Sequence, residues 1–295
     1  MLRQAENKVN IEGIVSEMDV RHGEAKSTGK PYIMADLKVR LNQDINGETR
    51  DIELPVKFFA MKDTKTGGVN PSYTSIKKME DTFVSIAACG DVDKATRVRI
   101  DRATIRENAF YGQGDTLVTY PQISASFVNS IDKAQCSDKA DFVAVIVIGG
   151  IREEVRNDEP TGRIIIRGII PQYGEQVDVV DFIVASNEAI NHIQTYWNEG
   201  DTVRVAGKVN FSSRVIHEEK SVGFGEPIIE DKTITVRELI VTSGSQSAFD
   251  GDMAYAADEI KAALADRQKR LEEMKNKNKT TAAPAEKKSS VGFDF

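Results

Sequence analysis

Apolar and polar residues alternate along most of the chain up to about residue 243. In the segment 31–41, for example, Ile33, Leu37 and Leu41 fall on one face of an extended chain, with polar residues between them. A period of two is typical of a half-buried strand. The same alternation of apolar and polar residues recurs in two blocks of the chain. Each block predicts five strands, with a short helix between the third and the fourth. The predicted strands are 8–20, 31–41, 49–60, 82–90 and 119–131, then 141–155, 162–170, 177–185, 202–211 and 233–241, with helices at 73–79 and 187–198.

Both blocks therefore have the order β-β-β-α-β-β. This is the order of the OB-fold, a five-stranded barrel with its helix between strands three and four. The segments 79–84 and 199–204 also resemble each other, each after a predicted helix and before a predicted strand. A repeat of this length indicates duplication of a whole domain. We predict an all-β protein of two tandem OB-fold barrels, residues 1–135 and 136–243.

The residue composition changes after the second block. Residues 243–247 are rich in Gly and Ser and predict a flexible joint, and 252–275 are strong helix formers with Asp252 as a candidate N-cap. The segment 244–275 is thus a linker and an amphipathic helix, whose apolar stripe favours packing on the protein's own domains or self-association. The stripe, which Arg267 interrupts, contains Met253, Ala257, Ile260, Leu264, Leu271 and Met274. Residues 276–295 are low in complexity and predict a disordered tail.

Composition narrows the function classes. The net charge is -7, so any phosphate-binding surface has to be local. No apolar run is long enough for a membrane helix, and the start lacks the core of a signal peptide. Two Cys and three His argue against a disulfide framework and a Cys/His zinc site, and they favour a cytoplasmic protein. No P-loop, G-x-S-x-G or H-E-x-x-H motif occurs, so we expect a non-enzymatic protein with no catalytic residue, cofactor or metal.

Two parts of the chain resemble one known family. The segment 7–15 (NKVNIEGIV) is similar to the first strand of bacterial single-stranded DNA-binding proteins. The segment 179–185, a following helix and 199–209 (EGDTVRVAGKV) are similar to that family's third strand, helix and fourth strand. The plan of an OB domain, a flexible tail and an aromatic-acidic tip is shared, although the family usually has one OB domain per chain. Its tip also has several acidic residues before Pro-Phe, where this chain has one Asp and no Pro.

The resemblance implies a protein that coats and protects single-stranded DNA in replication, recombination and repair. It also implies that the tip (Phe293, Asp294 and Phe295) recruits partner enzymes, the alternative being a ragged end with incidental aromatics. A compact two-domain version suits a bacteriophage, in which case the protein acts in the cytoplasm of the bacterial host.

Strand alternation gives a candidate binding face on the first block. Side chains that stack on bases and side chains that contact phosphates point outward from its second and third strands, which form the usual OB binding face. An ordinary solvated sheet face is the alternative. The candidates are Tyr32, Lys38, Arg40, Lys57 and Phe59.

Four arginines within ten residues follow the predicted fourth strand. We interpret this segment, which ends at Tyr111, as the loop between strands four and five that wraps a single strand, because arginine neutralises phosphate and stacks on bases. The alternative is a hairpin whose charges only keep it soluble, since Asp101 and Glu107 offset part of the positive charge. The arginines are Arg97, Arg99, Arg102 and Arg106.

The second block has an apolar outer face, which includes Ile165, Val179 and Ile183. Such a face normally marks an interface, here with the first block, another subunit or the C-terminal helix. Trp197 is expected in the core. A long loop is predicted from Phe211 to Lys232. Candidate phosphate contacts in this block are Arg163, Arg167, Arg204, Lys208 and Arg214.

Two other functions stay open. The net acidity and the apolar face favour a protein-interaction scaffold without useful DNA affinity. RNA binding is the third reading, because an OB barrel does not by itself select the sugar.

Overall fold

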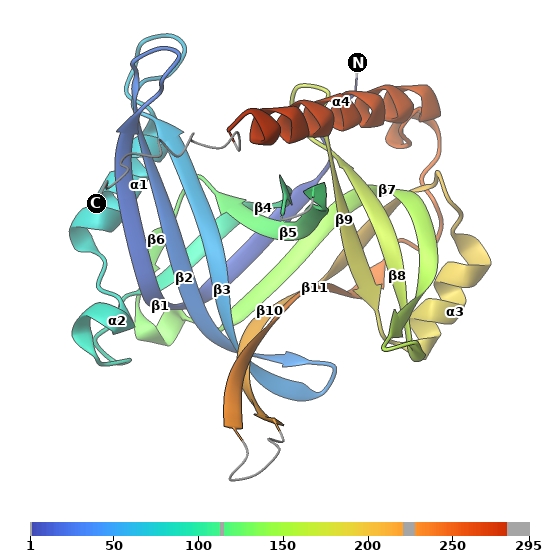
Figure 1. The fold of residues 1–295 in the computed structure, drawn as a ribbon, viewed down its shortest axis with the longest axis horizontal. Helices are drawn as coiled ribbons and strands as arrows, with labels where there is room; N and C mark the ends of the chain where they lie inside the picture. The colour runs from blue at the N-terminus through green and yellow to red at the C-terminus, as the bar shows by residue number, and fades with distance from the viewer. Residues whose placement is uncertain (1, 113–114, 221–227, 282–295) are drawn as a thin grey trace, which may run out of the picture.

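The computed structural model describes residues 2–112, 115–220 and 228–281, and strands dominate it. Five of them form an N-terminal β-ring in the order β1-β2-β3-β5-β4, which closes because β4 also pairs with β1 (Figure 1). The β3–β5 pair is parallel and the other pairs are antiparallel. The strands are β1 (Asn7–Glu24), β2 (Pro31–Ile45), β3 (Glu48–Met61), β4 (Arg97–Tyr111) and β5 (Leu117–Ala125), and a short β6 (Asn129–Ile131) pairs with β4.

A C-terminal β-ring repeats this plan. Its order is β7-β8-β9-β11-β10, and the β10–β7 pairing closes it. The helix α3 (Asn187–Tyr196) lies between its third and fourth strands, as predicted. The strands are β7 (Lys139–Arg156), β8 (Glu159–Pro171), β9 (Val177–Val184), β10 (Thr202–Lys220) and β11 (Ile228–Gly244).

The two β-rings share one sheet. β1 pairs with β7 from Asn7↔Ala144 to Glu12↔Lys139, so strands of both rings belong to a single eleven-stranded sheet. The buried Gln43 at the end of β2 adds to the junction: its Nε2 donates to Val209 O at 2.8 Å, and its Oε1 accepts from Ala140 N at 3.0 Å. Removing such an amide would leave buried backbone groups unpaired, which is costly.

The predicted faces of β2 and β3 are confirmed. Ile33, Leu37, Leu54 and Val56 are fully buried inside the N-terminal β-ring, while Phe59 points outward. The period of two is sufficient here because both strands run without interruption through the ring wall. Trp197 is buried, as expected.

The predicted strand 82–90 is wrong. It contains the end of α1 (Pro71–Thr82) and a short helix α2 (Ile86–Cys89). Ser85 caps α2, its side chain accepting from Ala88 N, and Gly90 ends it at φ 68°, a conformation that favours glycine. The true fourth strand is β4, so the arginine-rich segment is part of the ring wall and not a loop.

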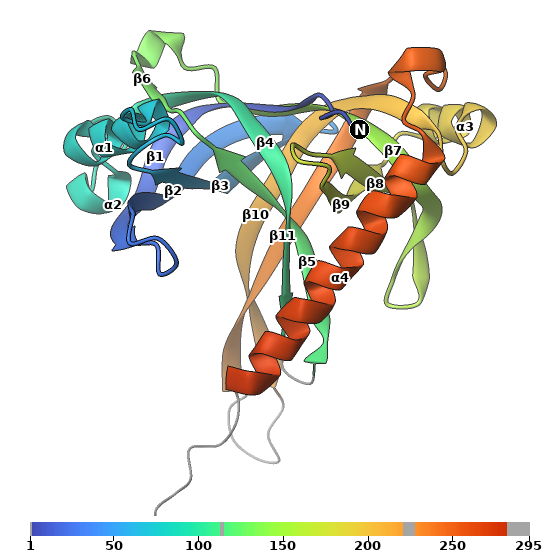
Figure 2. The ribbon, with the colours of Figure 1, turned by 90° about the horizontal axis from the view of Figure 1, so that it is seen from above.

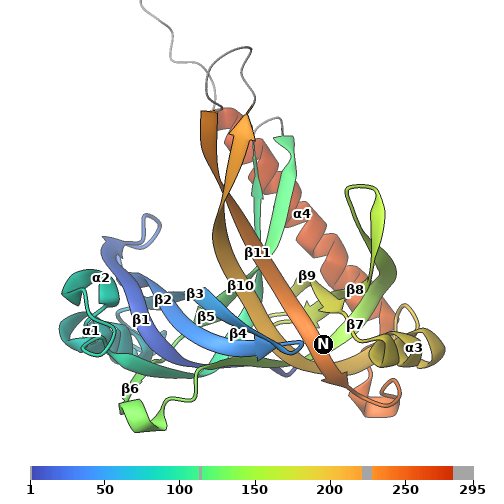
Figure 3. The ribbon, with the colours of Figure 1, turned by 90° about the horizontal axis from the view of Figure 1, so that it is seen from below.

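The predicted loop from Phe211 to Lys232 is also wrong for residues 211–220 and 228–232, and 221–227 lie outside the described residues. β10 and β11 continue as one antiparallel ladder from Ala206↔Ser243 to Lys220↔Ile228. The far ends of β10–β11, of β4–β5 and of the C-terminal helix α4 (Ala257–Thr281) lie together in an arm that projects from the body (Figures 2 and 3).

The helix α4 differs from its prediction at both ends. Asp252 lies in a 3-10 turn, η3 (Gly251–Met253), and does not cap α4, which begins at Ala257. Residues 276–281, assigned to the disordered tail, continue α4, and 282–295 lie outside the described residues. Among the described residues, no helix is both long and apolar enough to cross a membrane.

The apolar outer face of the C-terminal β-ring is covered by the chain itself. β9 contacts α4, β4 and β5, and Ile165, Val179 and Ile183 are buried. On the helix, Ile260 and Leu271 are buried, whereas Met253 and Met274 are exposed. Of the occupants that the sequence left open, the structure therefore shows the C-terminal helix and the first block.

Candidate nucleic-acid interface

An aromatic pair lies on the outer face of the N-terminal β-ring. Phe59 on β3 is 58% exposed, and its aromatic ring centroid is 5.4 Å from that of Tyr32 on β2. Gly23, opposite Tyr32 in the β1–β2 ladder, makes room for the tyrosine, because a Cβ there would lie 2.5 Å from Tyr32 Cζ. Phe59 offers flat apolar surface to solvent, whereas Tyr32 is half-buried.

A shallow hollow of about 420 Å³ begins at Phe59 and crosses the sheet from β2 to β4. Lys57, which forms an ion pair with Asp36, lines it together with Arg102. Arg102 lies at φ 68° at an irregularity of β4, and it has no ion pair or hydrogen bond within the described residues. Its guanidinium is therefore available to an anion. The hollow also contains Thr104 on β4 and Gln122 and Ser124 on β5.

The other two basic candidates, Lys38 and Arg40 on β2, are also ion-paired, and unlike Lys57 they do not line the hollow. Lys38 lies 2.7 Å from Glu17 and 3.7 Å from Glu53, and Arg40 lies 2.6 Å from Asp51. Glu17 is the main cause of the raised pKa of Lys38. Exposed ion pairs of this kind contribute only about 0–1 kcal/mol each. For Lys38 and Arg40, the structure favours the alternative of a solvated sheet face.

Three of the four clustered arginines brace the fold. Arg97 is mostly covered and lies 3.7 Å from Asp93. Arg106 lies 2.9 Å from Asp178 of the C-terminal β-ring. The pairing of β4 with β1 places Arg99 2.9 Å from Glu12. Only Arg102 of the four lies at the hollow.

Glu12 is the most strongly held carboxylate at the junction of the two β-rings. It accepts from Arg99 and from the backbone N and the hydroxyl of Ser137, and it lies 3.0 Å from Lys139. Burial opposes its ionisation, but hydrogen bonds from Ser137, Lys139 and Arg99 outweigh burial and hold its pKa at about 2. Arg99 therefore has a structural partner that competes with any phosphate.

Asp178 gives a pH-dependent prediction. Burial raises its pKa to about 6, with Arg106 lowering it and Glu107 raising it. A carboxyl whose pKa rises on folding stabilises the protein when protonated, so this contribution is present below its ordinary pKa of 3.8 and is lost as the pH rises through 6. A shift of this size corresponds to about 3 kcal/mol.

We expect Asp178→Asn to gain thermal stability relative to the wild type as the pH rises from about 4 to about 8, because the variant cannot ionise. Thermal unfolding of both proteins across this range measures the difference. A difference that does not change with pH would contradict the account.

The remaining candidates lie apart from the hollow. Lys275 Nζ lies 5.7 Å from the centroid of the Tyr111 aromatic ring at the end of β4. Arg163 forms hydrogen bonds with the buried Glu154 and Glu238, and Arg204 with Glu6 at 3.0 Å. Arg167 is exposed, and Lys208 is half-buried. The side chain of Arg214 and the tip of Phe293, Asp294 and Phe295 lie outside the described residues.

A second and larger hollow, of about 710 Å³, lies between the two β-rings, and sequence reasoning missed it. We call it the inter-ring groove. Tyr120 on β5 lines one side, Arg152, Arg156 and Arg167 on β7 and β8 line the other, and Arg237 on β11 joins them. No local signal marks these residues as neighbours, because they come from four strands far apart in sequence.

The comparison with solved structures shows which known fold this chain is similar to. Among solved structures, the wild-type single-stranded DNA binding protein from Thermus aquaticus matches with a TM-score of 0.51 and 10% identity, over 87% of this chain and 99% of that chain. A deletion variant of the same protein matches with the same score and identity, over 84% of this chain and 97% of that chain. At this identity the likeness shows the fold alone.

A search of curated proteins found no match. The model of one protein family, YorF, matches residues 5–277, which is nearly all of the chain that the structure describes. This chain belongs to the YorF family.

Proposed function

We propose that this protein binds single-stranded DNA with two OB-fold barrels, which correspond to the two β-rings. The helix after the third strand in each ring and the closing strand pairs support this interpretation. The likeness to the Thermus aquaticus protein supports it at the level of the fold. We keep the proposed boundaries 1–135 and 136–243 for the two domains.

One observation carries the proposal: an outward-facing aromatic pair, of which Phe59 is exposed and Tyr32 half-buried, adjoins a hollow that holds Arg102, an arginine without an ion pair among the described residues. Bases of a single strand stack on Tyr32 and Phe59, while Arg102 and Lys57 contact the phosphates. Paired bases are not available for such stacking. The hollow lies on β2–β5, the face that OB-folds use for oligonucleotides.

The scaffold alternative has lost one of its two supports. The net acidity of the chain is unchanged, but α4, β4 and β5 cover the apolar face of the second block. The proposed role is to coat and protect single strands in replication and recombination, in the bacterial cytoplasm. Recruitment of partner enzymes by Phe293, Asp294 and Phe295 remains part of the proposal.

Binding to labelled oligo-dT, duplex DNA and RNA at two salt concentrations tests the proposal. We expect oligo-dT to bind far more tightly than duplex, with affinity that falls as salt rises. Each phosphate contact adds about -0.7 to the slope of log affinity against log salt for single strands. Equal binding to duplex, or no response to salt, would contradict the proposal, and tighter binding to RNA would reassign the ligand.

A further inference from the structure

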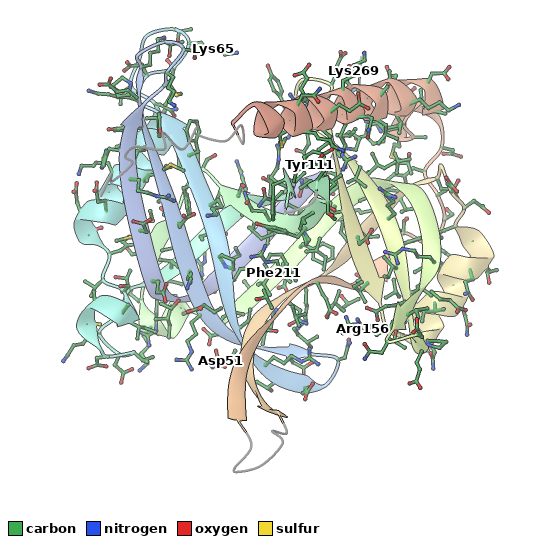
Figure 4. All side chains as sticks on the ribbon, viewed as in Figure 1. Asp51, Lys65, Tyr111, Arg156, Phe211 and Lys269 are labelled. Carbon is green, nitrogen blue, oxygen red and sulfur yellow. The ribbon has the colours of Figure 1, made fainter. Side chains whose placement is uncertain are left out.

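The inter-ring groove has two walls from different β-rings. Tyr120 and Pro121 on β5 form part of one wall, and the outer face of β8–β9, with Arg167 and Asp181, forms part of the other. α4 borders the groove through Arg267 and Leu271. Figure 4 marks Arg156 near the lower ends of β7 and β8 and Tyr111 below α4, with many side chains in the region between them. The groove therefore exists only when both rings and α4 are assembled.

Buried carboxylates hold exposed guanidiniums at this groove. The side chains of Glu154 and Glu238 are only 7% and 9% exposed, whereas that of Arg156, which pairs with both, is 55% exposed. Arg152, 61% exposed, lies 2.9 Å from Asp181. Hydrogen bonds from Arg163 lower the pKa of Glu154 to about 2, so this carboxylate stays charged. The negative charge lies mainly in the floor and the positive charge faces the solvent.

Two further arginines of the groove have no carboxylate partner within the described residues. Arg167 is exposed on β8. Arg237 on β11 lies with its guanidinium carbon 3.9 Å from the centroid of the Tyr120 aromatic ring. This stack joins the two β-rings. It also presents aromatic and planar cationic surface of the kind on which bases stack.

Phe110 extends this stack toward the solvent. Its aromatic ring lies edge-on to that of Tyr120, with centroids 6.1 Å apart, and it is 42% exposed. The groove thus combines aromatic surface with cations, as the hollow on the N-terminal β-ring does. An acidic peptide without aromatic residues would use the cations but would leave the aromatic surface uncovered.

β5 connects the hollow to the groove. Gln122 and Ser124 line the hollow, and Thr119 and Tyr120 line the groove. At about 3.3 Å per residue, Thr119 and Ser124 are roughly 16 Å apart along the strand. A ligand longer than a few nucleotides that leaves the hollow along β5 therefore enters the groove.

We propose that the inter-ring groove is a second binding track for single-stranded DNA, continuous with the hollow across β5 and occupied only by longer strands. This inference rests on the proposed function. Short strands fill the hollow at Tyr32 and Phe59. Longer strands add contacts to Arg167, Arg237 and the Tyr120 stack.

The test uses the full chain and two labelled oligo-dT lengths, about 8 and about 30 nucleotides, chosen from the range of sites that single OB-folds cover. The variant Arg167→Ala/Arg237→Ala removes the two arginines without carboxylate partners. We expect it to lower the affinity for the long oligonucleotide at least tenfold and its salt slope by about 1.4, from two phosphate contacts of about 0.7 each. The affinity for the short oligonucleotide should change less than twofold.

A matched control removes the same charge elsewhere. Lys94 and Lys133 are exposed near β6, outside the groove, and Lys94→Ala/Lys133→Ala should leave both lengths within about twofold of the wild type, because screened charges act over only about 10 Å. If thermal unfolding shows that the arginine variant is not folded, the variant Arg167→Lys/Arg237→Lys replaces it in the test. That variant keeps the charge and loses the stack, so the affinity for the long oligonucleotide should fall while the slope stays unchanged.

Three results would overturn the inference. The first is an arginine variant that binds the long oligonucleotide as the wild type does. The second is an equal loss at both lengths, and the third is polyglutamate displacing the long strand as well as unlabelled oligo-dT does. If the wild type binds neither length, the proposed function itself fails, which distinguishes the two failures.

Discussion

Replacing both Tyr32 and Phe59 by alanine is expected to abolish most single-strand binding. Stacking of one base on one aromatic residue contributes about 1–3 kcal/mol, so each substitution should lower affinity by about 5- to 150-fold. The salt slope should stay nearly unchanged, because the cations Lys57 and Arg102 remain in place. Fluorescence anisotropy with labelled oligo-dT measures both quantities.

Tyr196→Ala is the matched control for this result. Tyr196, at the end of α3, is also 58% exposed. It also contacts a neighbouring aromatic side chain, because its ring centroid lies 4.8 Å from that of the His192 imidazole. The helix α3 lies on the side of the C-terminal β-ring that faces away from the N-terminal β-ring (Figure 1). If this control weakens binding as much as Phe59→Ala does, the aromatic pair is not the site.

Of the substitutions proposed as tests, replacing Glu12 by glutamine should cause the largest loss in the free energy of unfolding. Its carboxylate accepts from Arg99 and Ser137 where β1, β4 and β7 meet, and breaking a buried pair on one side costs about 3–5 kcal/mol. Urea unfolding of Glu12→Gln measures this cost. Glu17→Ala, which removes only the exposed pair with Lys38, should cost no more than about 1 kcal/mol.

The same substitution carries a pH signature. The folded-state pKa of Glu12, about 2, lies below its ordinary 4.5, so its contribution is present above pH 4.5 and is lost as the pH falls toward 2. The stability gap between wild type and Glu12→Gln should therefore narrow over that interval. A gap that is constant with pH, or no larger than that of Glu17→Ala, would contradict this role.

The outer face at Tyr32 and Phe59 was predictable because β2 and β3 are regular. Every second residue of both strands faces the same side, so the buried positions fix the exposed ones. β4 is not regular. Its buried positions change phase between Ile100 and Ala103, at the irregularity that contains Arg102, and charged residues hide the remaining alternation. The sequence therefore predicts a loop where β4 lies, and it predicts a strand at 82–90, a segment that contains the apolar helix at 86–89.

The ion-pair partners of the charged side chains were less predictable than the exposed faces of the strands. A sequence shows that Arg99 and Arg106 are basic, but their partners Glu12 and Asp178 lie 87 and 72 positions away. Arg267 interrupts the apolar stripe of the C-terminal helix because it pairs with the buried side chain of Glu107 on β4. Only the folded structure distinguishes the arginines that form ion pairs within the protein from those, such as Arg102, whose guanidinium remains available to a ligand.

Photo-crosslinking tests the central claim most directly. Oligo-dT carrying bromodeoxyuridine is bound to the intact chain and irradiated, and the adducts are located by peptide mass spectrometry. The account predicts adducts at Tyr32 and Phe59 on the outer face of the N-terminal β-ring. A bound strand that gives adducts elsewhere in the chain and none at these two residues would contradict it.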